Sequence, residues 1–232
     1  MKMKENSMWT ELIKLWKADN LLKQAYQQSY EMLDIAHDMF RKAIESLRHT
    51  DTEVDEDTRR KDKLINQYER EVRRKVLTHL SVMGTTDLPA GLVLVTIIID
   101  IERIGDYIKN ILDLANLHVP KLDNPEFIRD LEQVETAVDT LFIRTLECLR
   151  TSNEDLALEL MSENKLLGKQ CEDVIQDLIK NQKEGLPTSD AVALALYFRY
   201  LKRINAHLKN ITSSVINPFD RIGYKYKGES KS

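Results

Sequence analysis

The sequence contains few residues that interrupt helices. There are only 7 glycines and 5 prolines among its 232 residues, whereas 31% of the residues are charged. Because glycine and proline are the strongest helix breakers, so few of them over this length favour long helices joined by short connections. A chain of this length can bury a sizeable hydrophobic core, in one domain or in two.

Cysteines and long apolar runs are also scarce. The 2 cysteines, Cys148 and Cys171, both stand within helical apolar patterns, which is typical of buried thiols in a reducing compartment and not of a disulfide framework. The longest apolar stretch, residues 91–99, has about half the length that a membrane span requires. Residues 1–6 are charged and contain no signal-peptide core. We therefore expect a soluble, cytoplasmic protein.

The charge balance and the motifs argue against two functional classes. The net charge is −4 and no basic block stands in the body of the chain, so nucleic acid is not expected as a partner. The sequence also has no recognisable nucleophile–base pair, glycine-rich phosphate loop or His/Cys metal set. We therefore expect no catalytic residues and a protein that acts through its surfaces.

A segment in the middle of the chain recurs about one hundred residues later. Residues 101–111 read IERIGDYIKNI and residues 201–211 read LKRINAHLKNI, so that Arg, Ile, Lys, Asn and Ile match position for position. The acidic residues do not match, because Glu102 is replaced by Lys202 and Asp106 by Ala206. A repeat of this kind indicates a duplicated helical unit whose second copy has lost its acidic pair.

The apolar periodicity predicts three helices in each copy. The expected fold is all-α, a tandem repeat of two three-helix bundles. The first repeat covers residues 1–119, the second covers residues 120–218, and residues 219–232 form a polar, flexible tail. The run Leu92–Ile99 is rich in β-branched residues and taken alone resembles a buried strand. Because a helical pattern follows it without a break, we expect a helix that is buried on all sides.

Acidic residues are placed so that they can meet across the first helical hairpin. Taking Gly84 as the turn, Asp62 and Asp106 stand at equal distances before and after it along the chain. Asn66 and Glu102 form a second equidistant pair, nearer to the turn, and Glu69 lies a further helical turn along from Asn66. Within each helix the spacing of four places the side chains on one face.

Converging carboxylates repel each other unless a positive charge lies among them. Two alternatives remain open. One is a hard cation such as iron, manganese or magnesium, or zinc, bound by the carboxylates. The other is an ordinary solvated ion network in which Arg103, Lys63 or Arg70 neutralises them.

Several of these residues resemble the motifs of the PhoU family of phosphate-signalling regulators. They are Asp62-Lys63 with Glu69 downstream, Asp87-Leu88, and Glu102-Arg103-Ile104-Gly105-Asp106 followed by Asn110-Ile111. The resemblance covers nearly the whole chain as a tandem repeat of three-helix units. It implies a negative regulator, not an enzyme, that links a phosphate ABC transporter to a sensor histidine kinase. It further implies a homodimer that is peripheral to the membrane only through its partners.

The resemblance also implies a metal ion or cluster, with iron foremost, held by acidic residues. Asp62, Glu102 and Asp106 correspond to the family's acidic positions, and Glu69 is a further candidate. The second repeat departs from the pattern, because Asn164 stands in place of Asp62, and Pro89 replaces an arginine that is usual after Asp-Leu. We expect Lys202 to pair with Glu163 and Glu172 there, in place of a cation.

Two other functions fit the same features. One is a carboxylate-bridged metal enzyme, which would need an open coordination position and a shielded pocket. The other is a metal-free helical adaptor. Bound metal without turnover would argue against the enzyme, and elemental analysis would distinguish the adaptor.

Other residues that could bind ligands have simpler structural interpretations. Asp87 suits a helix N-cap, and the Asp34/His37 pair has metal-ligand spacing but no second motif to complete a site. His207, at the position of Tyr107, suits packing or a partner surface. Trp9 and Trp16 lie seven apart on one helix face and suit a core or dimer contact, and Asn110 and Asn210 suit structural hydrogen bonds.

Overall fold

The computed structural model of the chain is built from six long helices. The structure describes residues 6–48, 52–117, 125–180 and 186–226, and no strand occurs among them. The helices are α1 (Asn6–Arg48), α2 (Thr52–Met83), α3 (Leu88–Leu117), α4 (Pro125–Thr151), α5 (Glu154–Ile179), α6 (Thr188–Ser213) and the short 3-10 helix η1 (Phe219–Arg221). The predicted all-α fold is confirmed.

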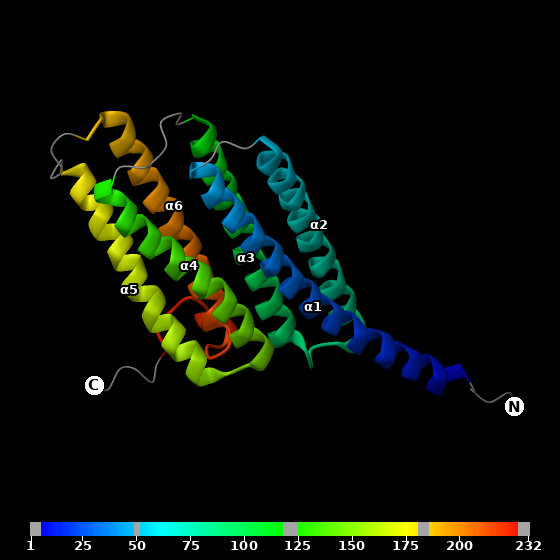
Figure 1. The fold of residues 1–232 in the computed structure, drawn as a ribbon. Coiled ribbons are helices and arrows are strands. Elements are labelled where there is room, and N and C mark those ends of the chain that lie inside the picture. Colours follow the sequence, from blue (N-terminus) through cyan, green and yellow to red (C-terminus); the bar gives the residue numbers. More distant parts are fainter. Residues whose placement is uncertain (1–5, 49–51, 118–124, 181–185, 227–232) are drawn as a thin grey trace, which may run out of the picture.

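The helices lie side by side as two groups of three. Figure 1 shows α1, α2 and α3 in one group and α4, α5 and α6 in the other. The groups meet where α3 packs against α6 and α1 against α4. Since α3 and α6 carry the two copies of the repeated segment, the repeat lies at the centre of the molecule.

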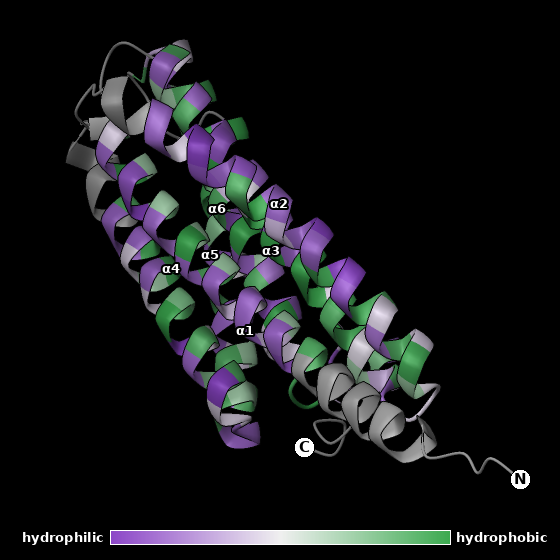
Figure 2. Ribbon diagram, turned by 90° about the vertical axis from the view of Figure 1, so that its right-hand side faces the viewer, coloured by the Kyte–Doolittle hydropathy of each residue, from purple (hydrophilic) through white to green (hydrophobic). Residues whose placement is uncertain are grey.

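Each group has an apolar core made by helical stripes. In α1 the side chains Met32, Leu33, Ala36, Met39, Phe40 and Ala43 are all buried, and in α4 so are Leu131, Val134, Val138, Leu141 and Phe142. Figure 2 shows the result, with hydrophilic turns on the outside of the helices and hydrophobic ones toward their neighbours. Burial of these stripes is the main force that holds the helices together.

The run Leu92–Ile99 lies within α3 and is helical, as predicted. The expectation that it is buried on all sides was wrong. Leu94, Ile97 and Ile98 are buried, but Leu92 is 36% and Ile99 37% exposed. The reason is that α1, α2 and α6 cover only part of the circumference of α3. No helix within the described ranges is both long enough and apolar enough to cross a membrane.

The turns fall where the sequence indicates them. Gly84 has a φ of 74°, a left-handed conformation that glycine adopts at no steric cost, and it begins the turn after α2. The main-chain oxygen of Asp87 accepts from Gly91 N at 2.9 Å, which places Asp87 at the start of α3. The Asp87 carboxylate lies 2.7 Å from His79 Nε2, so it connects the two helices of the hairpin.

The chain folds back after α6. Gly223 N donates to Ser213 Oγ at 2.7 Å, and Lys209 Nζ donates to Gly223 O at 3.3 Å. Part of the segment that was expected to be a flexible tail, residues 219–226, is therefore held against α6. The rest of that segment, residues 227–232, lies outside the described residues.

Candidate functional site

The acidic residues of the first repeat lie where α2 packs against α3. Asp62 on α2 is only 8% exposed, and its Oδ2 accepts hydrogen bonds from Lys109 Nζ at 3.1 Å and from Asn66 Nδ2 at 3.2 Å. Lys109 belongs to α3, so this contact joins the two helices. The predicted meeting of the two helix faces is found in the structure.

Lys109 also binds the acidic residue one turn before it. Its Nζ lies 2.9 Å from Asp106 Oδ1, so that one ammonium group bridges two carboxylates. Burial is the largest single influence on Lys109 and lowers its pKa, but the hydrogen bonds to Asp106 and Asp62 and the charges of these two carboxylates together outweigh burial and raise the pKa. The ammonium therefore supplies, within the chain, the positive charge that these carboxylates need.

Glu102 has the least compensated charge in this cluster. Burial raises its pKa above the ordinary value, and the nearby Asp106 and Glu69 carboxylates raise it further. Its contact with a cation is loose, since Arg103 Nε lies 3.6 Å from Glu102 Oε2. The influence of Glu69 shows that the acidic groups of α2 and α3 are close enough to repel.

The remaining contacts of the cluster are local ion pairs. Arg103 lies 3.5 Å from Asp106 Oδ2, and Glu69 Oε1 lies 2.7 Å from Arg73 NH2 on the next turn of α2. Of the three neutralising cations that the sequence suggested, only Arg103 has this role. Sequence reasoning missed Lys109 and Arg73, although their i,i+3 and i,i+4 spacing from Asp106 and Glu69 was a usable signal.

The cluster as it stands is an ion network. Across the described part of the chain, no three His, Cys, Asp or Glu side chains are grouped so that they could hold a metal ion. The donor chemistry of Asp62, Glu69, Glu102 and Asp106 suits a hard cation, but Lys109 lies between Asp62 and Asp106. A metal ion therefore fits only if the Lys109 ammonium moves out.

The positions of the second repeat that correspond to the acidic cluster have different ion pairs. Lys202 forms an ion pair with Glu172, as predicted. The prediction for Glu163 was wrong, because both of its carboxylate oxygens accept from Arg144 NH1 at 2.6 Å. Arg144 lies on α4, whereas the sequence pattern offered a partner on α6. Asn164, the counterpart of Asp62, is buried and donates to Leu160 O at 2.7 Å.

The Asp34/His37 pair does not form a site. His37 Nε2 lies 2.6 Å from Asp139 Oδ1 and Asp34 Oδ2 accepts from Arg150 NH2 at 3.2 Å, so both side chains connect α1 to α4. The side chains of Trp9 and Trp16 lie outside the described residues.

His207 and Asn210 connect the two repeats. His207 Nδ1 lies 2.7 Å from Asp100 Oδ1, which also accepts from Asn210 Nδ2 at 3.0 Å. The His207 ring stacks on Tyr107, with 5.8 Å between the ring centroids. The packing interpretation of His207 and the structural hydrogen bond of Asn210 are confirmed.

The chain is similar to several known proteins. The PhoU domain family matches residues 30–115, which lie within the first repeat. Over 177 residues the chain is 23% identical to an uncharacterized protein of Methanocaldococcus jannaschii, a match that covers 76% of this chain and 59% of that protein. The chain therefore spans less than two thirds of the length of this relative.

Two crystal structures have a similar fold. One is PhoU from Pseudomonas aeruginosa, with a TM-score of 0.78 and 21% identity over 85% of this chain and 96% of that one. The other is the phosphate transport system regulatory protein PhoU from Streptococcus pneumoniae, with a TM-score of 0.76 and 17% identity over 86% of this chain and 95% of that one. The resemblance to the PhoU family is thus confirmed: the chain contains a PhoU domain at residues 30–115, and its six helices have the PhoU fold.

Proposed function

We propose that this protein is a regulator of phosphate uptake and phosphate signalling. The observation that carries the proposal is the PhoU domain at residues 30–115 within a six-helix fold shared with PhoU proteins. One of those proteins is named as a regulatory protein of a phosphate transport system. A protein of this kind acts without catalysing a reaction.

The regulation works through protein contacts. The partners are a phosphate ABC transporter and its sensor histidine kinase, and the protein is a cytoplasmic homodimer that reaches the membrane only through them. The long helices of the described part of the chain have hydrophilic outer faces, which provide extended surfaces for such contacts.

The acidic cluster of the first repeat is a second part of the proposal. Asp62, Glu69, Glu102 and Asp106 would take up a metal ion such as iron, with zinc, manganese and magnesium as alternatives. The support is the raised pKa of Glu102, which is due first to burial and then to the nearby carboxylates of Asp106 and Glu69. The metal would take the place of the Lys109 ammonium between Asp62 and Asp106.

A deletion strain tests the regulatory role. Its phosphate uptake and the phosphorylation of the sensor kinase are measured in high and in low phosphate, with and without a plasmid copy of the gene. We expect kinase signalling to stay on in high phosphate when the gene is deleted and to be restored to normal control by the plasmid copy. Normal repression of the kinase in the deletion strain would contradict the proposal.

A further inference from the structure

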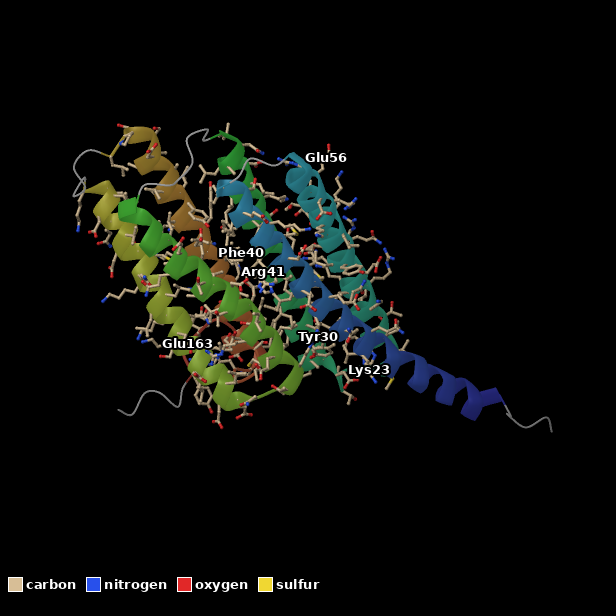
Figure 3. All side chains as sticks on the ribbon, in the orientation of Figure 1. Lys23, Tyr30, Phe40, Arg41, Glu56 and Glu163 are labelled. Carbon is tan, nitrogen blue, oxygen red and sulfur yellow. The ribbon has the colours of Figure 1, made fainter. Side chains whose placement is uncertain are left out.

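Helix α2 concentrates positive charge in its middle. Between residues 59 and 75 there are eight lysines and arginines and three acidic residues, although the whole chain has a net charge of −4. Figure 1 places α2 at the outer edge of the first repeat, with α1 and α3 on its inner side. In Figure 3, side chains with nitrogen tips project from the outer side of α2.

Four of the basic residues, with one glutamine among them, form a stripe along one face of the helix. The members follow one another at spacings of three and four and are all exposed: Arg60, Lys63, Gln67, Arg70 and Arg74. Such a spacing keeps side chains on one helix face, and with 1.5 Å per residue the stripe is about 21 Å long. The three acidic residues of the segment lie off the stripe, because Asp62 is buried and Glu69 and Glu71 are half-buried.

The positive charge of the stripe is largely uncompensated. Of its members, only Arg60 forms an ion pair with a described residue, namely Asp57. Lys63, Arg70 and Arg74 form none within the described ranges. The acidic neighbours Asp62 and Glu69 pair with Lys109 and Arg73, which lie off the stripe. Glu71 accepts a hydrogen bond from Gln67 at 2.8 Å and offsets part of the charge of Arg74 without forming an ion pair with it. A line of exposed cations without ion-pair partners is a surface that attracts an acidic partner.

Part of the acidic surface near the first repeat is already paired within the chain. Four acidic residues on the first repeat and beside it are held by cations of their own chain: Asp34 by Arg150, Asp38 by Lys61, Asp113 by Arg59 and Asp139 by Arg41. Glu31, Glu45 and Glu56 are exposed and form no ion pair with a described residue. A second copy that docked through the four paired carboxylates would have to break these ion pairs.

The shape of the stripe favours a rod-like acidic partner. It is a single row of side chains, which complements the carboxylate row of an acidic helix better than a flat lipid surface. The row continues into Leu77, which is 68% exposed. The exposed Leu77 side chain therefore offers an apolar contact at one end of the basic row.

We propose that the basic stripe of α2, Arg60, Lys63, Arg70 and Arg74 with Leu77 at its end, docks an acidic helical segment of a partner protein. This rests on the proposed function, since a regulator that acts through protein contacts needs such a surface. The docking is electrostatic along the row and is fixed at one end by Leu77.

A pair of peptides tests the geometry of the stripe. One helical peptide, long enough to cover the row, carries its glutamates on one face at spacings of three and four. The other has the same length and composition, with glutamates all around the helix. Dissociation constants are measured by fluorescence anisotropy for the full chain. We expect the one-faced peptide to bind at least about tenfold more tightly, because only its carboxylates can all reach the row.

Charge reversals locate the site. The variant Lys63→Glu/Arg70→Glu/Arg74→Glu is expected to lose at least about tenfold in affinity for the one-faced peptide. The matched control Lys165→Glu/Lys169→Glu/Arg199→Glu changes the net charge equally on positions of α5 and α6 that lie away from the stripe, and its affinity is expected to stay within about threefold of the wild type. Circular dichroism confirms that both variants are folded. Equal losses in the two variants, or equal binding of the two peptides, would overturn the proposal.

Two further measurements separate this proposal from its alternatives. Vesicles of phosphatidylcholine mixed with anionic phosphatidylglycerol test a lipid surface as the alternative partner. If the wild-type chain binds these vesicles, the α2 variant does not, and the peptides bind only weakly, the proposed protein partner is overturned. The purified ATPase subunit of the phosphate transporter tests the proposed function. If the wild-type chain and the α2 variant bind that subunit equally, the stripe is not the docking site for it, whereas the proposed function is supported. If the peptides distinguish the variants but the subunit does not bind the wild-type chain, the stripe is a docking site for acidic helices and the ATPase subunit is not its partner.

Discussion

The ammonium group of Lys109 lies 3.1 Å from the Asp62 carboxylate, across the contact between α2 and α3. This pair connects the two helices at a point where Asp62 is only 8% exposed. Because Lys109 also binds Asp106, it sets the charge balance of the acidic cluster and competes with any cation that would bind there.

Removal of the Lys109 ammonium tests its structural role. We expect Lys109→Met to lower the free energy of unfolding by about 1–3 kcal/mol, because among the described residues it leaves the buried Asp62 carboxylate with Asn66 as its only hydrogen-bond partner. Lys63→Met, at an exposed position of α2 without an ion pair among the described residues, is the control and is expected to change stability by less than about 0.5 kcal/mol. Urea unfolding measures both. Equal effects would show that Lys109 contributes no more than a surface lysine.

The raised pKa of Glu102 predicts a pH dependence. The folded protein disfavours the ionised form, so ionised Glu102 lowers stability above its folded pKa, and this loss disappears as the pH falls below the unfolded value. Glu102→Gln removes the charge. It is therefore expected to stabilise the metal-free protein at pH 7 by less than about 1 kcal/mol and to have no effect near pH 3. Thermal unfolding at both pH values checks this, and a destabilised variant at pH 7 in the presence of chelator would contradict it.

Metal content tests the proposed site directly. If the cluster takes up a metal, the purified wild-type protein retains it in stoichiometric amount, and Glu102→Gln with Asp106→Asn abolishes that retention. Elemental analysis by mass spectrometry measures this, with Lys202→Gln in the second repeat as the control. Retention that survives the double change would show that these carboxylates are not ligands, and absence of metal from the wild type would favour the ion network.

The two basic residues of the second repeat are expected to differ in their contributions. Lys202 pairs with Glu172 at a half-exposed site, so Lys202→Ala should lower the free energy of unfolding by only about 0.5–1 kcal/mol. Arg144 binds Glu163, and its NH2 group also lies 3.0 Å from Glu159 Oε1. Arg144→Ala should therefore lower the free energy of unfolding by more, about 1–2 kcal/mol. Urea unfolding of the two variants ranks them, and the reverse order would contradict the assigned pairing.

Gly223 provides a test of the segment that folds back on α6. It has a φ of 84°, and a Cβ atom at this position would lie 2.7 Å from Asn210 Oδ1. Gly223→Ala is therefore expected to lower the free energy of unfolding by about 2–3 kcal/mol, since it strains the backbone and displaces the Asn210 side chain from Asp100. Gly84→Ala has a similar φ of 74° and nothing within 4 Å of its Cβ, so it should cost only about 1 kcal/mol. Equal thermal shifts for the two variants would show that the contact with Asn210 is unimportant.

The sequence by itself determined the secondary structure and the repeat. Glycines and prolines are few, and the apolar residues recur every three or four positions, so the helices and their apolar faces are set by local chemistry. The position of Gly84 fixed the register of the first hairpin, and with it the approach of Asp62 to α3. These features depend on neighbours along the chain or on a short turn, which is why they can be read without a structure.

Only the tertiary structure decided which charges meet. Lys109 is separated from Asp62 by 47 residues, and the choice between Lys109, Lys63 and Arg70 depends on side-chain direction across a helix pair. Glu163 binds Arg144 and not Lys202, because α4 approaches α5 on the side that Glu163 faces. The same holds for His207 and Asp100, which meet only because α3 packs against α6. Long flexible side chains have several partners within reach, so their pairing is set by the packing of distant helices and not by spacing in the sequence.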